Sequence, residues 1–177
     1  MLEGASVARE CDSLPFHLEG SADLTAPVEA VFDFLDDFEQ LGAHMMRSTA
    51  MMAGSRMRYE FDAARGRKVN ARVRVLGSIL GIKLQIEECV TERAPPFRKA
   101  WRTTGPQRML VLDAYRMGYE LVAREQGCRA RVFIDYAIPP AGLSHWLARA
   151  AAARYARWCV NGVLAGVTGR YGTERSG

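Results

Sequence analysis

The chain lacks a long hydrophobic run: its 177 residues contain no apolar stretch of the length, about 18 residues, that predicts a membrane-spanning helix. We therefore expect no stable membrane insertion. The first residues include acids and no apolar core segment, which is unlike a secretory signal. We predict a flexible arm over residues 1–14, one domain over residues 15–172, and a cytoplasmic location.

Cysteine and histidine are scarce, and neither is clustered in a way that predicts a site. The four cysteines form no C-x-x-C pair: Cys11, Cys89, Cys128 and Cys159. Disulfides and a zinc site are therefore not expected. The three histidines fall in separate predicted elements: His17, His44 and His145. Known nucleotide-binding, metalloprotease and hydrolase motifs are absent, so we expect no cofactor and no nucleophilic enzyme.

A dense basic block is missing too, although the formal net charge is +4 and the pI is near 9.0. Basic side chains are spread among 20 acids, so we expect no nucleic-acid binding. Instead we predict a lattice of cross-strand ion pairs on the wet face of a sheet. Its arginines are Arg56, Arg58, Arg72, Arg74, Arg98, Arg102, Arg116 and Arg131, and its acids are Glu19, Glu60, Glu87, Glu120 and Asp135. The oligomeric state stays open.

Strict alternation of apolar and polar residues is what the chain does have. Residues 16–24 alternate in this way, which is typical of a strand with one wet face. Six later segments show the same period: 57–61, 69–75, 82–86, 97–103, 115–121 and 132–138. Turn residues separate the segments, as at Pro95-Pro96, so we predict antiparallel neighbours joined by short loops.

Three segments have the spacing of helices. TAPVEAVFDFLDD follows the first strand, and a second short helix is predicted from Phe38 to about Met46. A long helix is predicted from Leu143 to about residue 168, with one stripe formed by Leu147, Ala151, Arg154/Tyr155, Trp158 and Gly162. A single long helix against seven strands requires a strongly curved sheet. We expect the space between them to hold a ligand of about 300 Å³ or more.

Three stretches carry a resemblance to a known family: LTAPVEAVFDFLDD, VTERAPPFRKAWRT, and RVFIDYAIPP leading into the last helix. Together they resemble the START/Bet v 1-like (SRPBCC) superfamily over about residues 15–170, closest to bacterial polyketide cyclase/dehydrase-like members. The resemblance implies an α+β helix-grip fold: a seven-stranded curved antiparallel sheet around a long C-terminal helix, with two short helices after the first strand. The superfamily includes lipid carriers and aromatase/cyclases, so fold alone does not choose a function.

Polar side chains on the predicted concave face are the candidate site residues. The tyrosines there are Tyr59, Tyr115, Tyr119 and Tyr136, and the apolar candidates beside them are Trp101, Met117 and Trp158. Such a set suits a greasy ligand with a few oxygens, or it is core packing with hydroxyls bonded to the backbone. Lys99 is the inward cation, and it either acts as an acid/base or reaches water at a strand end. With Tyr115, Tyr119 and Tyr136 it is a candidate catalytic residue.

The stretch HMMRSTAMM holds half of the eight methionines: Met45, Met46, Met51 and Met52. Three interpretations remain: a flexible apolar gate at the mouth of the cavity, static core, or a copper(I) site with His44. We favour the gate and expect no metal, because nothing else in the chain supports copper binding.

Three functional hypotheses follow from these features. The first is binding of a hydrophobic small molecule or lipid in an internal cavity, as a carrier. The second is a polyketide aromatase/cyclase that acts on a bound poly-keto chain, which would be a cyclase/dehydrase-type lyase. The third is an interaction protein with a filled core.

Overall fold

The computed structural model describes residues 14–43, 56–79, 82–105, 108–109, 111–139 and 145–172. Within them one antiparallel sheet has the strand order β1-β7-β6-β5-β4-β3-β2. The strands are β1 (Phe16–Leu24), β2 (Arg56–Phe61), β3 (Arg72–Ile79), β4 (Ile82–Ala94), β5 (Arg98–Thr103), β6 (Ala114–Arg124) and β7 (Gly127–Ala137). The helices are α1 (Val28–Asp36), α2 (Phe38–Leu41) and α4 (His145–Tyr171). The predicted helix-grip architecture is therefore confirmed.

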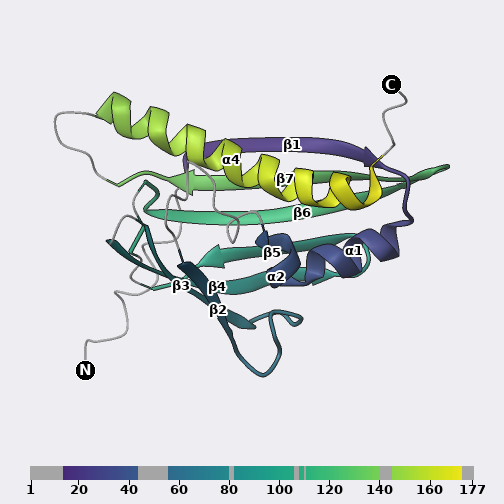
Figure 1. The fold of residues 1–177 in the computed structure, drawn as a ribbon, viewed down its shortest axis with the longest axis horizontal. Coiled ribbons are helices and arrows are strands. Elements are labelled where there is room, and N and C mark those ends of the chain that lie inside the picture. Colours follow the sequence, from purple (N-terminus) through teal and green to yellow (C-terminus); the bar gives the residue numbers. More distant parts are fainter. Residues whose placement is uncertain are drawn as a thin grey trace, which may run out of the picture.

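The long helix α4 lies across the concave face, along β1 and β7 (Figure 1). Its buried side consists of small residues: Ala152, Ala156, Cys159, Val160, Val163 and Val167. The predicted stripe is wrong at Leu147, which is 50% exposed, and at Ala151 and Arg154, which are exposed, whereas Tyr155 and Trp158 do pack against the core. Small side chains let the helix approach the sheet closely, and a Cβ on Gly20 would lie 2.9 Å from Leu164 Cδ1. The prediction gave weight to large side chains, whereas alanine and valine form most of this interface.

Two local features interrupt the simple alternation. β3 begins at Arg72 rather than at the predicted Val69, because Asn70 turns the chain with φ of 68° and leaves Val69 exposed. In β4 the register to β5 shifts between Val90 and Glu92, as at a β-bulge. Beyond this shift the odd-numbered residues of β4, rather than the even-numbered ones, point to the inner face of the sheet. Arg93 therefore lies opposite Lys99.

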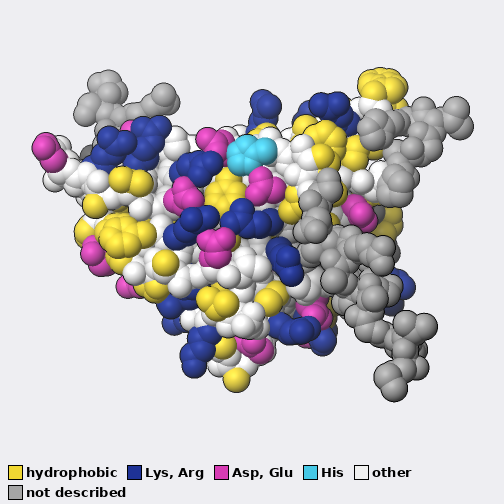
Figure 2. All heavy atoms as spheres, turned by 180° about the vertical axis from the view of Figure 1, so that it is seen from behind, with side chains coloured by type: hydrophobic (Ala, Val, Ile, Leu, Met, Phe, Trp, Pro, Cys, Tyr) yellow, Lys and Arg dark blue, Asp and Glu magenta, His cyan; other side chains and the backbone are white. Residues whose placement is uncertain are grey.

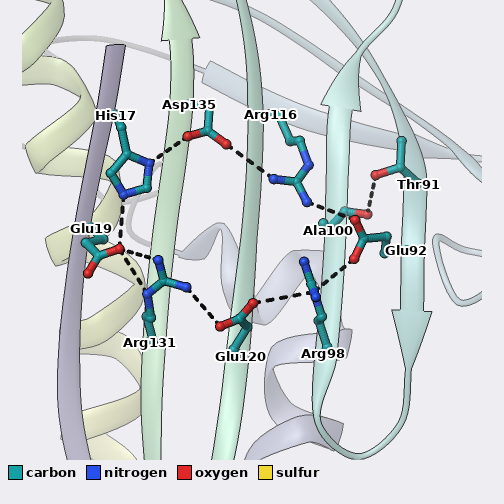
Figure 3. A network of polar contacts seen from close by, with 10 residues as sticks. All are labelled: His17, Glu19, Thr91, Glu92, Arg98, Ala100, Arg116, Glu120, Arg131 and Asp135. Carbon is teal, nitrogen blue, oxygen red and sulfur yellow. Dashed lines mark hydrogen bonds and ion pairs between the residues drawn. The ribbon is translucent and has the colours of Figure 1, made fainter. Parts of the chain in front are cut away.

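The convex face carries the predicted ion-pair lattice. Figure 2 shows acidic and basic side chains interspersed there, and Figure 3 shows the connected part. Arg116 bridges Glu92 at 2.9 Å and Asp135 at 3.2 Å. His17 lies on this outer face, where its Nδ1 is 2.6 Å from Asp135. The arginines are therefore largely neutralised by neighbouring acids, as expected for a solvated face.

We predict opposite effects for two glycine-to-alanine substitutions. Gly127 closes the β6–β7 turn with φ of 106°, and an added Cβ would lie 1.9 Å from the Leu24 carbonyl oxygen. Gly127→Ala should lower the free energy of unfolding by more than about 1 kcal/mol, because that conformation does not accept a side chain. Gly166 lies in α4 with no atom near an added Cβ, so Gly166→Ala should raise stability by about 0.5–1 kcal/mol. Urea denaturation of both variants measures this, and destabilisation by Gly166→Ala would contradict the helix packing.

Candidate ligand-binding cavity

A cavity lies between the concave face of the sheet and helices α2 and α4. Its aromatic lining comes from five residues: Phe38, Tyr59, Trp101, Tyr115 and Tyr155. The volume is only about 40 Å³, so the expectation of 300 Å³ or more is wrong for the space that the described residues enclose. Side chains of the core fill most of the region between sheet and helix. A larger hollow of about 740 Å³ beside the β6–β7 turn is open to solvent.

Glu88 is the acidic group in the lining of this cavity. Its side chain extends from β4, and the residue is 5% exposed. The Tyr115 hydroxyl on β6 donates a hydrogen bond to Glu88 Oε1, and the Trp101 side chain on β5 also hydrogen-bonds to the carboxylate. Burial raises the pKa of Glu88 to about 7, although these two donors partly oppose the shift. Glu88 therefore changes its protonation state near neutral pH.

Two further polar groups reach the cavity from α4. Tyr155 and Cys159 are one helical turn apart and hydrogen-bond to each other. Burial raises the pKa of the Cys159 thiol to about 12, so the thiol stays protonated and unreactive at neutral pH. Tyr59 on β2 contributes a third hydroxyl, packed so close to Gly42 that a Cβ there would overlap it. The cavity is thus apolar with a small polar group of three hydroxyls, a thiol and a carboxyl.

Four of the predicted ligand-binding residues line the cavity: Tyr59, Trp101, Tyr115 and Met117. Three others do not. Tyr136 stacks on Phe16 with ring centroids 5.4 Å apart, and Trp158 packs beside Tyr155, against both the main core and the smaller cluster on β2–β4. Tyr119 is fully buried against Phe32, and its hydroxyl has no hydrogen-bond partner among the described residues. A contact between any of these seven residues and a ligand stays a prediction.

Lys99 does not reach water, which corrects one of the two interpretations given to it. The residue is fully buried, and its Nζ lies 2.8 Å from both the carboxylate and the backbone carbonyl of Asp36. Arg93 completes the cluster with bonds of 3.2 and 2.9 Å to the two carboxylate oxygens. Burial alone would raise the pKa of Asp36, but the bonds from Arg93 and Lys99 bring it below its usual range. The geometry therefore favours a structural role for Lys99 over an acid/base role.

The methionine segment lies outside the described residues. The gate at Met45, Met46, Met51 and Met52 thus stays a prediction, as does the copper alternative with His44. Within the described part of the chain, no group of three histidine, cysteine or acidic side chains could hold a metal ion. In the same part, no helix is both long and apolar enough to cross a membrane.

Sequence reasoning missed Glu88, Tyr155 and Cys159. A signal for Glu88 was present, because Leu84 and Ile86 are buried on the inner face and residue 88 continues the alternation. The predicted stripe of α4 includes Tyr155 but not Cys159, and helical spacing alone does not show that these two side chains meet Glu88 in one cavity.

Comparison with known proteins places the chain in a family. The sequence model of the family described as "Polyketide cyclase / dehydrase and lipid transport" matches residues 15–170. No protein with a curated description matches the chain significantly in sequence.

Solved structures share the fold at low identity. A Thermus thermophilus protein, TTHA0849, superposes with a TM-score of 0.64 and 17% identity, covering 88% of this chain and 96% of that one. A Thermobifida fusca protein gives 0.61 and 18% over 88% and 93%, and Ara h 8.0201 gives 0.58 and 11% over 88% and 99%. The chain therefore belongs to the polyketide cyclase/dehydrase and lipid transport family, with the Bet v 1-like helix-grip fold, and this membership supports hydrophobic ligand binding in general.

Proposed function

We propose that the protein binds a small hydrophobic molecule, or the apolar part of a lipid, between the sheet and α4, and serves as its carrier. The observation that carries this proposal is the cavity between the sheet and α4, whose lining is apolar apart from a few polar groups gathered around Glu88. Ligand sites usually have this composition, an apolar wall with few polar groups that fix the orientation. Family membership supports the same function.

The cavity must widen for such a ligand to enter. A volume of about 40 Å³ is below the roughly 150 Å³ of an engineered cavity that binds benzene. α4 packs mainly on β1 and β7, whereas the cluster of Met57, Val75, Leu84 and Ile86 on β2–β4 is separate from the main core. We therefore expect widening by separation of α4 from β2–β4, where Trp158 covers this smaller cluster.

Two buried valines of α4 provide the test. Val163 lines the cavity, while Val167, one turn later, is equally buried elsewhere in the core. Val163→Ala should enlarge the cavity and tighten binding of N-phenyl-1-naphthylamine, an uncharged fluorescent probe, at least threefold. Val167→Ala should cost similar stability without changing affinity, because its new space lies outside the cavity. Fluorescence titration and urea denaturation measure the two effects.

Two results of this titration would refute ligand binding in the cavity. The first is no saturable binding of the probe by the natural protein. The second is an equal change of affinity in both valine variants, which would mean that the probe responds to general loosening of the core.

A second candidate function is cyclisation of a bound poly-keto chain, followed by dehydration. The Glu88–Tyr115 pair favours it, because a carboxyl with a pKa of about 7 can accept a proton from carbon and return one to a leaving hydroxyl. One carbon–carbon bond would form between an enolised carbon and a carbonyl, and water would leave. Loss of product formation from a linear poly-keto thioester in Glu88→Gln and in Tyr115→Phe tests it. This function ranks second, because such a chain needs far more space than the cavity provides.

A further inference from the structure

Glu88 is unusual among buried acids because no cation of the described residues touches it. Among the described residues that line the cavity there is no lysine, arginine or histidine, and Glu88 is the sole carboxyl. Lys99 on β5 is the cation that acts on Glu88 from a distance, but its ammonium bonds to Asp36. Buried carboxylates are normally paired. The charge of Glu88 is therefore held by neutral hydrogen-bond donors.

The groups that face Glu88 from the surrounding elements are neutral near physiological pH. They are Tyr59 on β2, Trp101 on β5, Tyr115 on β6, and Tyr155 and Cys159 on α4. Burial raises the pKa of Tyr59 and Tyr115, and burial together with the nearby Cys159 raises that of Tyr155. These hydroxyls therefore stay protonated, and Glu88 is the group in this set that changes charge near neutral pH.

We propose that Glu88 is a selectivity residue, and that the cavity accepts apolar molecules with an uncharged, hydrogen-bond-donating head such as a hydroxyl, while it rejects carboxylates. This inference rests on the proposed ligand binding. A carboxylate has about four lone-pair sites, and the bonds from Tyr115 and Trp101 leave capacity for a ligand donor. An anionic head would lie beside an anion without a neutralising cation, and such repulsion is strong away from water.

Two probes with the same bicyclic body test the proposal: 2-naphthol, which is uncharged at pH 8, and 2-naphthoic acid, which is ionised. The natural protein should bind 2-naphthol at least tenfold more tightly at pH 8, measured by calorimetric titration. In Glu88→Gln the preference should fall below threefold, because glutamine is uncharged and nearly isosteric. At pH 5.5 the preference should also weaken in the natural protein, because Glu88 is then protonated while 2-naphthoate is still ionised.

The matched control is Glu87→Gln, one residue earlier on the opposite face of β4, where Glu87 pairs with Arg72 and Arg74. This variant should keep the tenfold preference. Equal affinity of the natural protein for 2-naphthol and 2-naphthoic acid would overturn the selectivity proposal, and so would a preference for 2-naphthol that persists in Glu88→Gln. In either case the proposed function stands as long as N-phenyl-1-naphthylamine still binds. Failure of all three probes to bind would refute both the selectivity proposal and the proposed function.

Discussion

Replacing Asp36 by alanine should lower the free energy of unfolding by about 3–5 kcal/mol, the usual cost of leaving one partner of a buried ion pair alone. Lys99 is fully buried, and without the carboxylate its ammonium would keep only the Asp36 backbone carbonyl and the Phe38 ring 4.3 Å away. Arg93 would lose both of its bonds to the carboxylate, but it is partly exposed and can turn to water. Urea denaturation at neutral pH measures the loss.

The control for this substitution is Asp33→Ala, which makes the same chemical change one turn earlier on the exposed side of α1. It should change stability by less than about 0.5 kcal/mol. The double variant Asp36→Leu/Lys99→Met should recover most of the loss, because apolar residues can replace a buried pair at little cost. A loss below about 1 kcal/mol in Asp36→Ala would show that Lys99 finds another partner, and a structural role for the pair would be refuted.

The sheet was predictable because strand alternation is a local signal. Each strand has one buried face, so the inward set of β6, Tyr115, Met117 and Tyr119, follows directly from a period of two. The same rule predicts that His17 points outward, and the structure agrees. The rule stops where the backbone departs from regular pairing, as at the register shift after Val90, which turns Arg93 toward Asp36.

The cavity was less predictable because it depends on packing between distant segments. Counting seven strands against one helix suggested a large space, but the alanine and valine face of α4 lets the helix settle close to the sheet. Likewise, the sequence shows Lys99 on the inward face of β5 but not that the end of α1 places Asp36 within 2.8 Å of its ammonium. Contacts between residues 63 positions apart have no local signal.

Glu88 should make stability depend on pH in the direction opposite to most acids. Its pKa is about 7 in the folded protein, compared with a usual value of 4.5, so between these values the folded state holds a proton that the unfolded state has lost. Stability therefore falls as pH rises from about 4.5 to about 7 and then levels off. At about 1.4 kcal/mol per pH unit, the full penalty is about 3–4 kcal/mol.

Glu88→Gln should remove this penalty. We expect equal stability of the variant and the natural protein at pH 4.5, and a gain of up to about 3–4 kcal/mol for the variant at pH 8, measured by urea denaturation at both pH values. Glu87→Gln provides the opposite case, because the bonds from Arg74 and Arg72 lower the pKa of Glu87 despite its partial burial. That variant should lose stability at pH 8, by less than about 1 kcal/mol for a surface pair. If Glu88→Gln were destabilising at pH 8, the carboxylate would be a net stabilising partner of Tyr115 and Trp101, and the unpaired charge on which the selectivity proposal depends would not exist.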